Sequence, residues 1–217
     1  MRKFSSGEFD ERVDFFDRMA QTTWLSGLHE ELVKRTGSWE NKHVLDVGCG
    51  TGRLLMRCQS GTSIVTGVDL SSRMISKSQK LFEGLGRGHN ATFLTADAEA
   101  LPFNEDEFDL TISACVLFLM PDPKKVLKEI ARVTKGRIAL LNPSYENSLK
   151  RANDYCTQYN LSGVEQEFLL QWGKVAEHRH RFQEDELSRI MTACGWRDVH
   201  HERHLDGLAL ITTGVNA

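Results

Sequence analysis

The sequence predicts an α/β fold, a doubly wound sheet of mostly parallel strands, and two observations predict it. Short apolar runs alternate with segments of helical period, which is the pattern of parallel strands joined by crossover helices. A glycine-rich turn follows the first run, as in sheets that bind a nucleoside-bearing ligand beyond their strand ends. The five apolar runs cover residues 44–47, 63–68, 91–94, 109–113 and 137–141.

Length and composition fit a single domain. The chain has 217 residues, 40% of them hydrophobic, which is enough for one well-buried core. We expect four parts: an N-terminal helical cap (1–35), a ligand-binding core (40–142), a helical lid insertion (144–181) and a closing helix with strands (182–217).

Charge and hydropathy exclude two classes of partner. The formal net charge is -3, whereas a protein that binds duplex nucleic acid needs a surplus of Lys and Arg to neutralise phosphates. The longest apolar run, residues 114–120, is too short to cross a bilayer. We therefore expect a soluble, cytoplasmic protein with a small-molecule substrate and no membrane span. The sequence leaves the oligomeric state open.

The first helical region covers residues 8–35. Its apolar residues, such as Phe9, Phe16 and Leu25, recur at helical spacing, with an interruption near residues 22–27. This pattern predicts two helices.

Capping residues mark two later helices. Ser71 can cap the helix after the second strand. Asp122 is an N-cap candidate, with Pro123 in the first helical position.

The connection after the fifth strand, residues 144–181, is longer than is usual between a helix and a strand. It is mostly polar and helix-forming. We expect it to join residues 8–35 as a cap over the mouth of the sheet, where doubly wound proteins bind ligands.

The chain closes with a helix and two strands. Leu187 and Met191 lie on the apolar face of the helix, which Gly195 can end in a left-handed conformation. Residues 196–213 predict two strands with a turn near residues 206–207.

The glycine turn itself narrows the choice of ligand. Residues 46–52 have the pattern D-x-G-x-G-x-G. A dinucleotide fingerprint needs G-x-G-x-x-G, but Arg53 stands in the place of the third glycine. A ligand with an amino-acid tail and no phosphate fits this turn better than a pyrophosphate does.

Four landmarks occur in order along the chain: the glycine turn with Asp69, then residues 97–103 (DAEALPF), 108–110 (FDL) and 116–123 (VLFLMPDP). With them the chain resembles class I S-adenosylmethionine-dependent methyltransferases, in the small-molecule branch of the ubiquinone and menaquinone enzymes. The resemblance implies a Rossmann-like seven-stranded sheet with an antiparallel last strand. It also implies S-adenosylmethionine as cofactor and S-adenosylhomocysteine as product.

The residue types at the turn suit that cofactor. Gly48 and Gly50 allow the backbone to approach the methionine part of the ligand. Asp46 either orients these amides or holds the ammonium group; alternatively, it only braces the turn. Asp69 is the expected acceptor for both ribose hydroxyls, because a carboxylate accepts two hydrogen bonds, or it only caps the next helix.

The resemblance adds three further contacts. It implies that the Asp97 side chain binds the adenine amino group and that the Ala98 backbone binds the ring nitrogen. It also implies that Ala114 and Cys115 lie beside the methionine sulfur.

Apolar walls are expected around the cofactor. Leu70 and Met74 are candidates, although both could belong to the core. An aromatic face favours a sulfonium by about 0.5 to 2 kcal/mol, so Trp24, and less readily Phe16, could cover the cofactor or simply pack. The predicted cofactor-binding residues are Trp24, Asp46, Gly48, Cys49, Gly50, Asp69, Leu70, Met74, Asp97, Ala98 and Ala114.

The catalytic machinery is less defined. The cofactor brings its own leaving group, so a general base is needed only for a protonated nucleophile of high pKa. Leu119 stands where the resembling branch often has a histidine. Tyr145, His178 and His180 are the remaining base candidates, against the alternative of a solvated helix face.

A second departure is the missing Pro-Gly before the fifth strand. Residues 134–137 predict a shortened turn there. This argues against close identity with a quinone methyltransferase.

Cysteine and histidine spacing predicts no metal and no disulfide framework. The five cysteines lack C-x-x-C spacing. Cys156 and Cys194 are either buried small hydrophobes or a thiol pair brought together by folding. Residues 200–204 hold three histidines, which a strand would point to opposite faces.

Three alternative functions remain open at this stage. They are an RNA- or protein-modifying methyltransferase, a non-catalytic module that binds S-adenosylmethionine, and a nucleotide-dependent oxidoreductase. A missing cavity beside Ala114 would favour the second.

Overall fold

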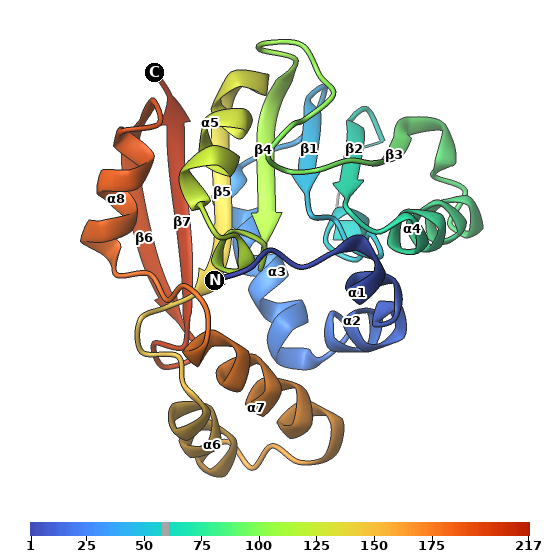
Figure 1. Cartoon of the computed structure of the whole chain (residues 1–217). Helices are drawn as coiled ribbons and strands as arrows, with labels where there is room; N and C mark the ends of the chain where they lie inside the picture. Colours follow the sequence, from blue (N-terminus) through green and yellow to red (C-terminus); the bar gives the residue numbers. More distant parts are fainter. Residues whose placement is uncertain (58–60) are drawn as a thin grey trace.

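The fold is a seven-stranded sheet flanked by helices (Figure 1). The computed structural model describes residues 1–57 and 61–217. The strand order is β3-β2-β1-β4-β5-β7-β6, and only the β5–β7 and β7–β6 pairs are antiparallel. The strands are β1 (His43–Val47), β2 (Ile64–Asp69), β3 (Ala91–Thr95), β4 (Phe108–Ala114), β5 (Thr134–Pro143), β6 (Trp196–His204) and β7 (Ala209–Asn216). The predicted fold class is confirmed, including the antiparallel last strand beside β5.

Helices cover both faces of the sheet and the carboxyl ends of its parallel strands. In Figure 1, α5 and α8 lie in front of the sheet, whereas α3 passes behind it and contacts β5 and β7. The helices are α1 (Ser6–Asp10), α2 (Val13–Met19), α3 (Thr23–Thr36), α4 (Ser72–Gly84), α5 (Pro123–Val133), α6 (Leu149–Gln158), α7 (Gly163–Glu177) and α8 (Glu184–Thr192). Short 3-10 turns cover Leu55–Arg57, Gly88–Asn90 and Leu117–Leu119.

Helices cover the carboxyl ends of the parallel strands. The arrowheads of β4 and β2 point toward α1 and α2, and α7 lies beside them at the same end of the molecule (Figure 1). Phe15 of α2 packs edge-on against Phe168 of α7, with ring centroids 4.9 Å apart. The N-terminal helices and the 144–181 insertion therefore form one cap.

The predicted helix ends are confirmed at three places. The Ser71 hydroxyl accepts a hydrogen bond from the Met74 N–H at 3.1 Å. The Asp122 carboxylate caps α5 in the same way, with Pro123 as its first residue. Gly195 has φ +97°, the left-handed conformation that favours glycine.

The N-terminal region has three helices, so the prediction of two was wrong. The chain breaks between α1 and α2 and again before α3. The Thr22 side chain accepts from the Leu25 N–H and starts α3, and Gly27 then lies inside that helix. The region where the sequence predicts an interruption is therefore a helix start.

The expected turn at residues 134–137 was also wrong, because α5 runs directly into β5. The register shifts between Phe108 and Leu110, where two β5 residues face Asp109. A Cβ on Gly136 would meet the Asp109 carbonyl oxygen at 2.2 Å. A β-bulge with an obligatory glycine thus replaces the turn.

The cysteines of the described ranges are unpaired. Cys49, Cys115, Cys156 and Cys194 are free thiols, and Cys58 lies outside the described residues. In residues 1–57 and 61–217, no cluster of three His, Cys, Asp or Glu side chains could hold a metal ion. No helix in these same ranges is long and apolar enough to cross a membrane.

Candidate functional site

A cavity of about 460 Å³ opens at the carboxyl ends of β1, β2 and β4, beneath the cap. This volume lies in the usual range for sites that enclose a small molecule. All of the predicted cofactor-binding residues except Trp24 line it. From the strand side these are Asp46, Gly48, Cys49, Gly50, Asp69, Leu70, Met74, Asp97, Ala98 and Ala114.

The glycine turn brings bare backbone to the cavity wall. Gly48 has φ +76°, and a Cβ there would lie 2.0 Å from Val116 Cγ2. Gly50 has φ +53°, and a Cβ there would meet nothing within 4 Å. Side chains are therefore excluded at Gly48 by contact and disfavoured at Gly50 by conformation.

The Asp69 side chain is held by hydrogen bonds from the backbone around it. Its carboxylate accepts from the Gly50 N–H and from the Ser71 N–H, both at 2.9 Å. Burial raises the pKa of Asp69, although these two hydrogen bonds oppose the rise. A carboxylate has further lone pairs, so Asp69 can still accept from a ligand hydroxyl.

Asp46 has no protein partner. Within the described part of the chain, both of its carboxylate oxygens are buried and lack a hydrogen bond. Burial, with the nearby Asp69 charge, raises the pKa of Asp46 well above its usual value. A buried carboxyl group without partners is costly, so this position fits the cationic ammonium of an amino-acid tail.

Asp97 is held by the N-terminal segment. The Lys3 Nζ lies 2.6 Å from both Asp97 oxygens and 2.6 Å from Glu99. Burial acts to raise the pKa of Asp97, but the Glu99 N–H and the Lys3 ammonium together lower it. The segment that carries Lys3 therefore crosses the rim of the cavity at this end.

The other end of the cavity is apolar. It is formed by α2, by the loop after β4 and by one face of α7. Cys115 follows Ala114 with φ +59°, and its thiol faces the Trp172 side chain. The apolar lining residues here are Phe15, Met19, Phe118, Leu119, Met120, Trp172 and Val175.

The structure places Trp24 away from the cavity. Trp24 is only 5% exposed and stacks on Trp172, with ring centroids 5.5 Å apart. Its indole N–H donates to the Glu165 carbonyl oxygen at 3.3 Å. Of the two readings for Trp24, packing is the one that matches its position. Phe16, in contrast, lines the cavity.

The three base candidates also lie outside the lining. Tyr145 is 53% exposed beneath the Arg181 guanidinium. His178 is exposed at the end of α7, and its Nδ1 lies 2.9 Å from the Lys174 carbonyl oxygen. His180 stacks on Phe182. Their sequence positions put them near the cap, but their side chains pack or face solvent instead.

Two features at or beside the cavity could not be recognised in the sequence. His29 of α3 lines the cavity, is 5% exposed and has an unpartnered Nδ1 among the described residues. Burial, helped by the charge of Arg57, lowers the pKa of His29 to about 3, so its imidazole is neutral. One buried histidine on an amphipathic helix looks like any core residue until its neighbours are known.

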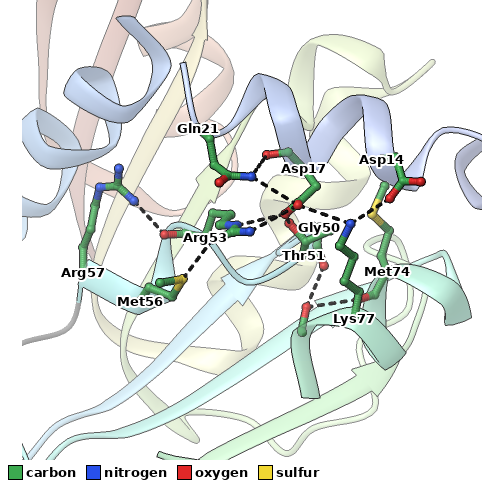
Figure 2. A network of polar contacts seen from close by, with 11 residues as sticks. Asp14, Asp17, Gln21, Gly50, Thr51, Arg53, Met56, Arg57, Met74 and Lys77 are labelled. Carbon is green, nitrogen blue, oxygen red and sulfur yellow. Dashed lines mark hydrogen bonds and ion pairs between the residues drawn. The ribbon is translucent and has the colours of Figure 1, made fainter. Parts of the chain in front are cut away.

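The second feature is a network around Asp17 (Figure 2). Its carboxylate accepts from the Thr51 hydroxyl at 2.8 Å, from Arg53 Nε at 2.9 Å and from Gln21, and it pairs with Lys77 at 3.2 Å. Burial opposes ionisation, but these bonds lower the pKa of Asp17 to about 2. Asp17 thereby ties α2 to the glycine turn and to α4.

The sequence is similar to those of known methyltransferases. Residues 38–199 match the family described as "Methyltransferase domain". The chain is 30% identical over 133 residues to the sterol 4-C-methyltransferase strm-1 of Caenorhabditis elegans, which covers 60% of this chain and 38% of that protein. It is 33% identical over 123 residues to the ubiquinone/menaquinone biosynthesis C-methyltransferase UbiE of Bdellovibrio bacteriovorus, covering 53% of this chain and 52% of that protein.

A solved structure of a methyltransferase has the same fold. Magnesium protoporphyrin IX methyltransferase (ChlM) from Synechocystis PCC 6803, with bound SAH, superposes with a TM-score of 0.68. It is 18% identical, and the alignment covers 94% of each chain. At 18% identity, this superposition is evidence of a shared fold alone. The chain spans less than two thirds of the two relatives described above.

Proposed function

Because the chain belongs to the methyltransferase domain family, we propose that it transfers a methyl group from S-adenosylmethionine to a small, partly apolar acceptor. The observation that supports this most is the buried, unpartnered Asp46 carboxyl group. It lies in the wall of a cavity bounded by the glycine turn and by Asp69. A ligand with an ammonium and a ribose would satisfy both acids.

The residues of the chain have separate roles in this proposal. Asp46 binds the ammonium, the Gly48–Gly50 backbone admits the methionine tail, and Asp69 accepts from the ribose hydroxyls. Asp97 and Ala98 receive the adenine. When bound, the cofactor supplies an activated methyl group on a sulfonium.

The cap residues align the acceptor and exclude water. The loop after β4 and helix α7 surround the position beside Ala114, and the cavity continues there past Cys115 to Trp172. This space supports an enzyme rather than a module that only binds the cofactor. No covalent intermediate is needed, so alignment is the main contribution of these side chains.

Calorimetric titration tests the proposal. The purified protein should bind S-adenosylmethionine and S-adenosylhomocysteine with micromolar affinity, and NAD should give no heat of binding. Binding of NAD alone, or of neither sulfur compound, would contradict the assignment. Turnover is then measured as S-adenosylhomocysteine released in the presence of candidate acceptors.

A further inference from the structure

Residues 1–4 lie across the rim of the cavity, and we call this segment the strap. It has no regular secondary structure, and Ser5 caps the helix α1 that follows it. Lys3 and Phe4 of the strap line the cavity. In Figure 1 the dark-blue chain before α1 runs across the end of the molecule to which the β4 arrowhead points. The strap therefore covers part of the space that a ligand has to enter.

One contact ties the strap to the loop after β3. The Lys3 Nζ lies 2.6 Å from both carboxylate oxygens of Asp97 and 2.6 Å from Glu99 Oε2. The Lys3 side chain is 28% exposed and that of Asp97 is 40% exposed, so water and salt reach this ion pair. Because Asp97 is the carboxylate proposed to receive the adenine, the Lys3 ammonium occupies a position that a ligand needs.

A second contact ties the strap to Arg179, which follows α7. The Arg179 guanidinium carbon lies 4.0 Å from the centre of the Phe4 ring, and Arg179 Nη1 donates to the Arg2 carbonyl oxygen at 2.9 Å. The same Nη1 lies 3.5 Å from the carbonyl oxygen of Leu119, in the loop after β4. Leu119 lines the apolar end of the cavity. The strap thus connects the loop after β3 with the loop after β4, and both loops line the cavity.

Contacts that involve side chains hold the strap in place. In the described structure, no backbone–backbone hydrogen bond involves residues 1–4. The capping box of Ser5 and Glu8 belongs to α1, so this helix start can persist when the strap moves. A partly exposed ion pair and a partly exposed cation–ring contact are each weak. The strap can therefore be released without unfolding the sheet.

Helix α2 is held more firmly than the strap. Its Asp17 side chain is 10% exposed and pairs with Arg53 at 2.9 Å and with Lys77 at 3.2 Å. Asp17 also accepts from the Thr51 hydroxyl, which is part of the glycine turn. The strap is therefore the part of the cap that opens more readily.

We propose that the strap is an autoinhibitory gate, which Lys3 and Arg179 hold closed over the empty cavity until a ligand enters. The gate depends on the cavity and not on the methyl transfer proposed above. Only the open form admits a ligand, so the association rate is reduced by the fraction of molecules that are open. A substitution that weakens either contact raises this fraction.

Stopped-flow binding of S-adenosylhomocysteine tests the gate. Lys3→Gln and Arg179→Gln should each raise the association rate constant about two- to fivefold, the range for a partly exposed ion pair or cation–ring contact. Only Arg179→Gln should also speed dissociation, because the adenine has taken Asp97 from Lys3 in the complex. Arg181→Gln is the matched control, since Arg181 lies over the Tyr145 ring outside the cavity. Unchanged association in both strap variants, or an equal rise in the control, would overturn the proposal.

Salt tests the ionic contact by itself. S-adenosylhomocysteine carries no net charge at neutral pH, so screening acts on the Lys3 pair rather than on the ligand. The association rate of the wild-type protein should rise as salt is increased to about 0.5 M, and that of Lys3→Gln should stay constant. The same salt dependence in both proteins would refute the role of Lys3 in the gate.

Thiol labelling tests the gate without a ligand. Cys115 lines the cavity, whereas Cys194 is buried with its thiol 3.7 Å from the Lys124 carbonyl oxygen and does not line it. With N-ethylmaleimide and peptide mass mapping, Cys115 should react about two- to fivefold faster in both strap variants, in proportion to the open fraction, and Cys194 at the wild-type rate. Equal labelling of Cys115 in all proteins, or an equal rise at Cys194, would overturn the gate. If Cys115 responds but S-adenosylhomocysteine does not bind, the proposed function fails and the gate stands.

Discussion

The two ends of the cavity are built from different parts of the fold. At one end, the termini of β1 and β2 and the loop after β3 present carboxyl groups beside bare glycine backbone. At the other, α2 and α7 present aromatic and aliphatic side chains. The first end is fixed by the hydrogen bonds of the sheet, and the second by side-chain packing between helices.

This difference matches the two ligands that we propose. The ligand at the strand ends is chemically constant, so rigid acids at set positions suit it. The acceptor differs among the named relatives, which include a sterol and a quinone-pathway methyltransferase. A wall made of helix side chains can change its shape while the sheet is left intact.

Replacement of Asp69 should separate the two ends most clearly. Asp69→Ala removes the proposed acceptor for two ribose hydroxyls, and charged hydrogen bonds of this kind correspond to roughly 100-fold in affinity. Calorimetry should show this loss for S-adenosylhomocysteine, with Asp69→Asn intermediate. Thermal unfolding checks that the variant still folds. Unchanged affinity in a folded Asp69→Ala protein would refute the assignment of this end.

Replacement of Asp17 should affect both ends, because Asp17 ties α2, which lines the apolar end, to the glycine turn at the other end. Asp17→Asn weakens the bonds to Thr51 and Arg53, and we expect S-adenosylhomocysteine to dissociate roughly tenfold faster in stopped-flow measurements. Asp14→Asn is the control, since Asp14 is exposed and its carboxylate pairs with Lys77. Similar rates in both variants would show that the Asp17 network does not hold the lid.

His29, the residue of α3 that lines the cavity, allows a test of how stability depends on pH. The pKa of His29 is about 3 in the folded protein and 6.5 in the unfolded chain, so the unfolded chain binds more protons between these values. The contribution of His29 to the free energy of unfolding is fully present well above pH 6.5 and decreases as the pH falls, by about 2 kcal/mol at pH 5. Urea unfolding of His29→Gln should show a flatter dependence over this interval. An identical slope in both proteins would mean that His29 is hydrated in the folded state.

Lys3 should give the smallest effect. Its ammonium occupies the Asp97 carboxylate that we assign to adenine, so Lys3→Gln should tighten S-adenosylhomocysteine binding by about two- to fivefold, as a partly exposed ion pair allows. Arg2→Gln removes the pair with Glu8 and the contact with the Phe4 ring but leaves the Lys3–Asp97 pair, and it should leave the affinity unchanged. Weaker binding in Lys3→Gln would show that Lys3 supports the adenine end instead of competing there.

The cavity end formed by the strand termini could be predicted from sequence because the residues that indicate it are close together in the chain. A buried run, a glycine turn and an acid at the next strand end are read within about 25 residues, and parallel topology then brings Asp46 and Asp69 together. The bulge at Gly136 was missed because its cause is the Asp109 carbonyl on the neighbouring strand. No property of residues 134–137 alone indicates that contact.

The cavity end lined by α2 and α7 could not be predicted, because its residues come together only when the helices pack. Trp24 and Trp172 are alike in the sequence, yet Trp172 lines the cavity and Trp24 packs behind it with its indole N–H bonded to Glu165. His29 and Asp17 give no motif, since each takes its role from neighbours distant in the chain. The regions 8–35 and 144–181 were expected to form a cap, but which side chains line it depends on how the helices rotate.

The Asp17 network has a consequence for the timing of turnover. One carboxylate holds Thr51, Arg53 and Lys77 at once, so α2 cannot lift from the glycine turn without leaving a partly buried charge unpaired. The same helix carries Phe15 and Phe16 into the cavity. Lifting α2 would therefore break these contacts and remove Phe15 and Phe16 from the cavity wall together. For the methyl transfer that we propose, we expect the release of products to depend on Asp17, an acid that does not itself line the cavity.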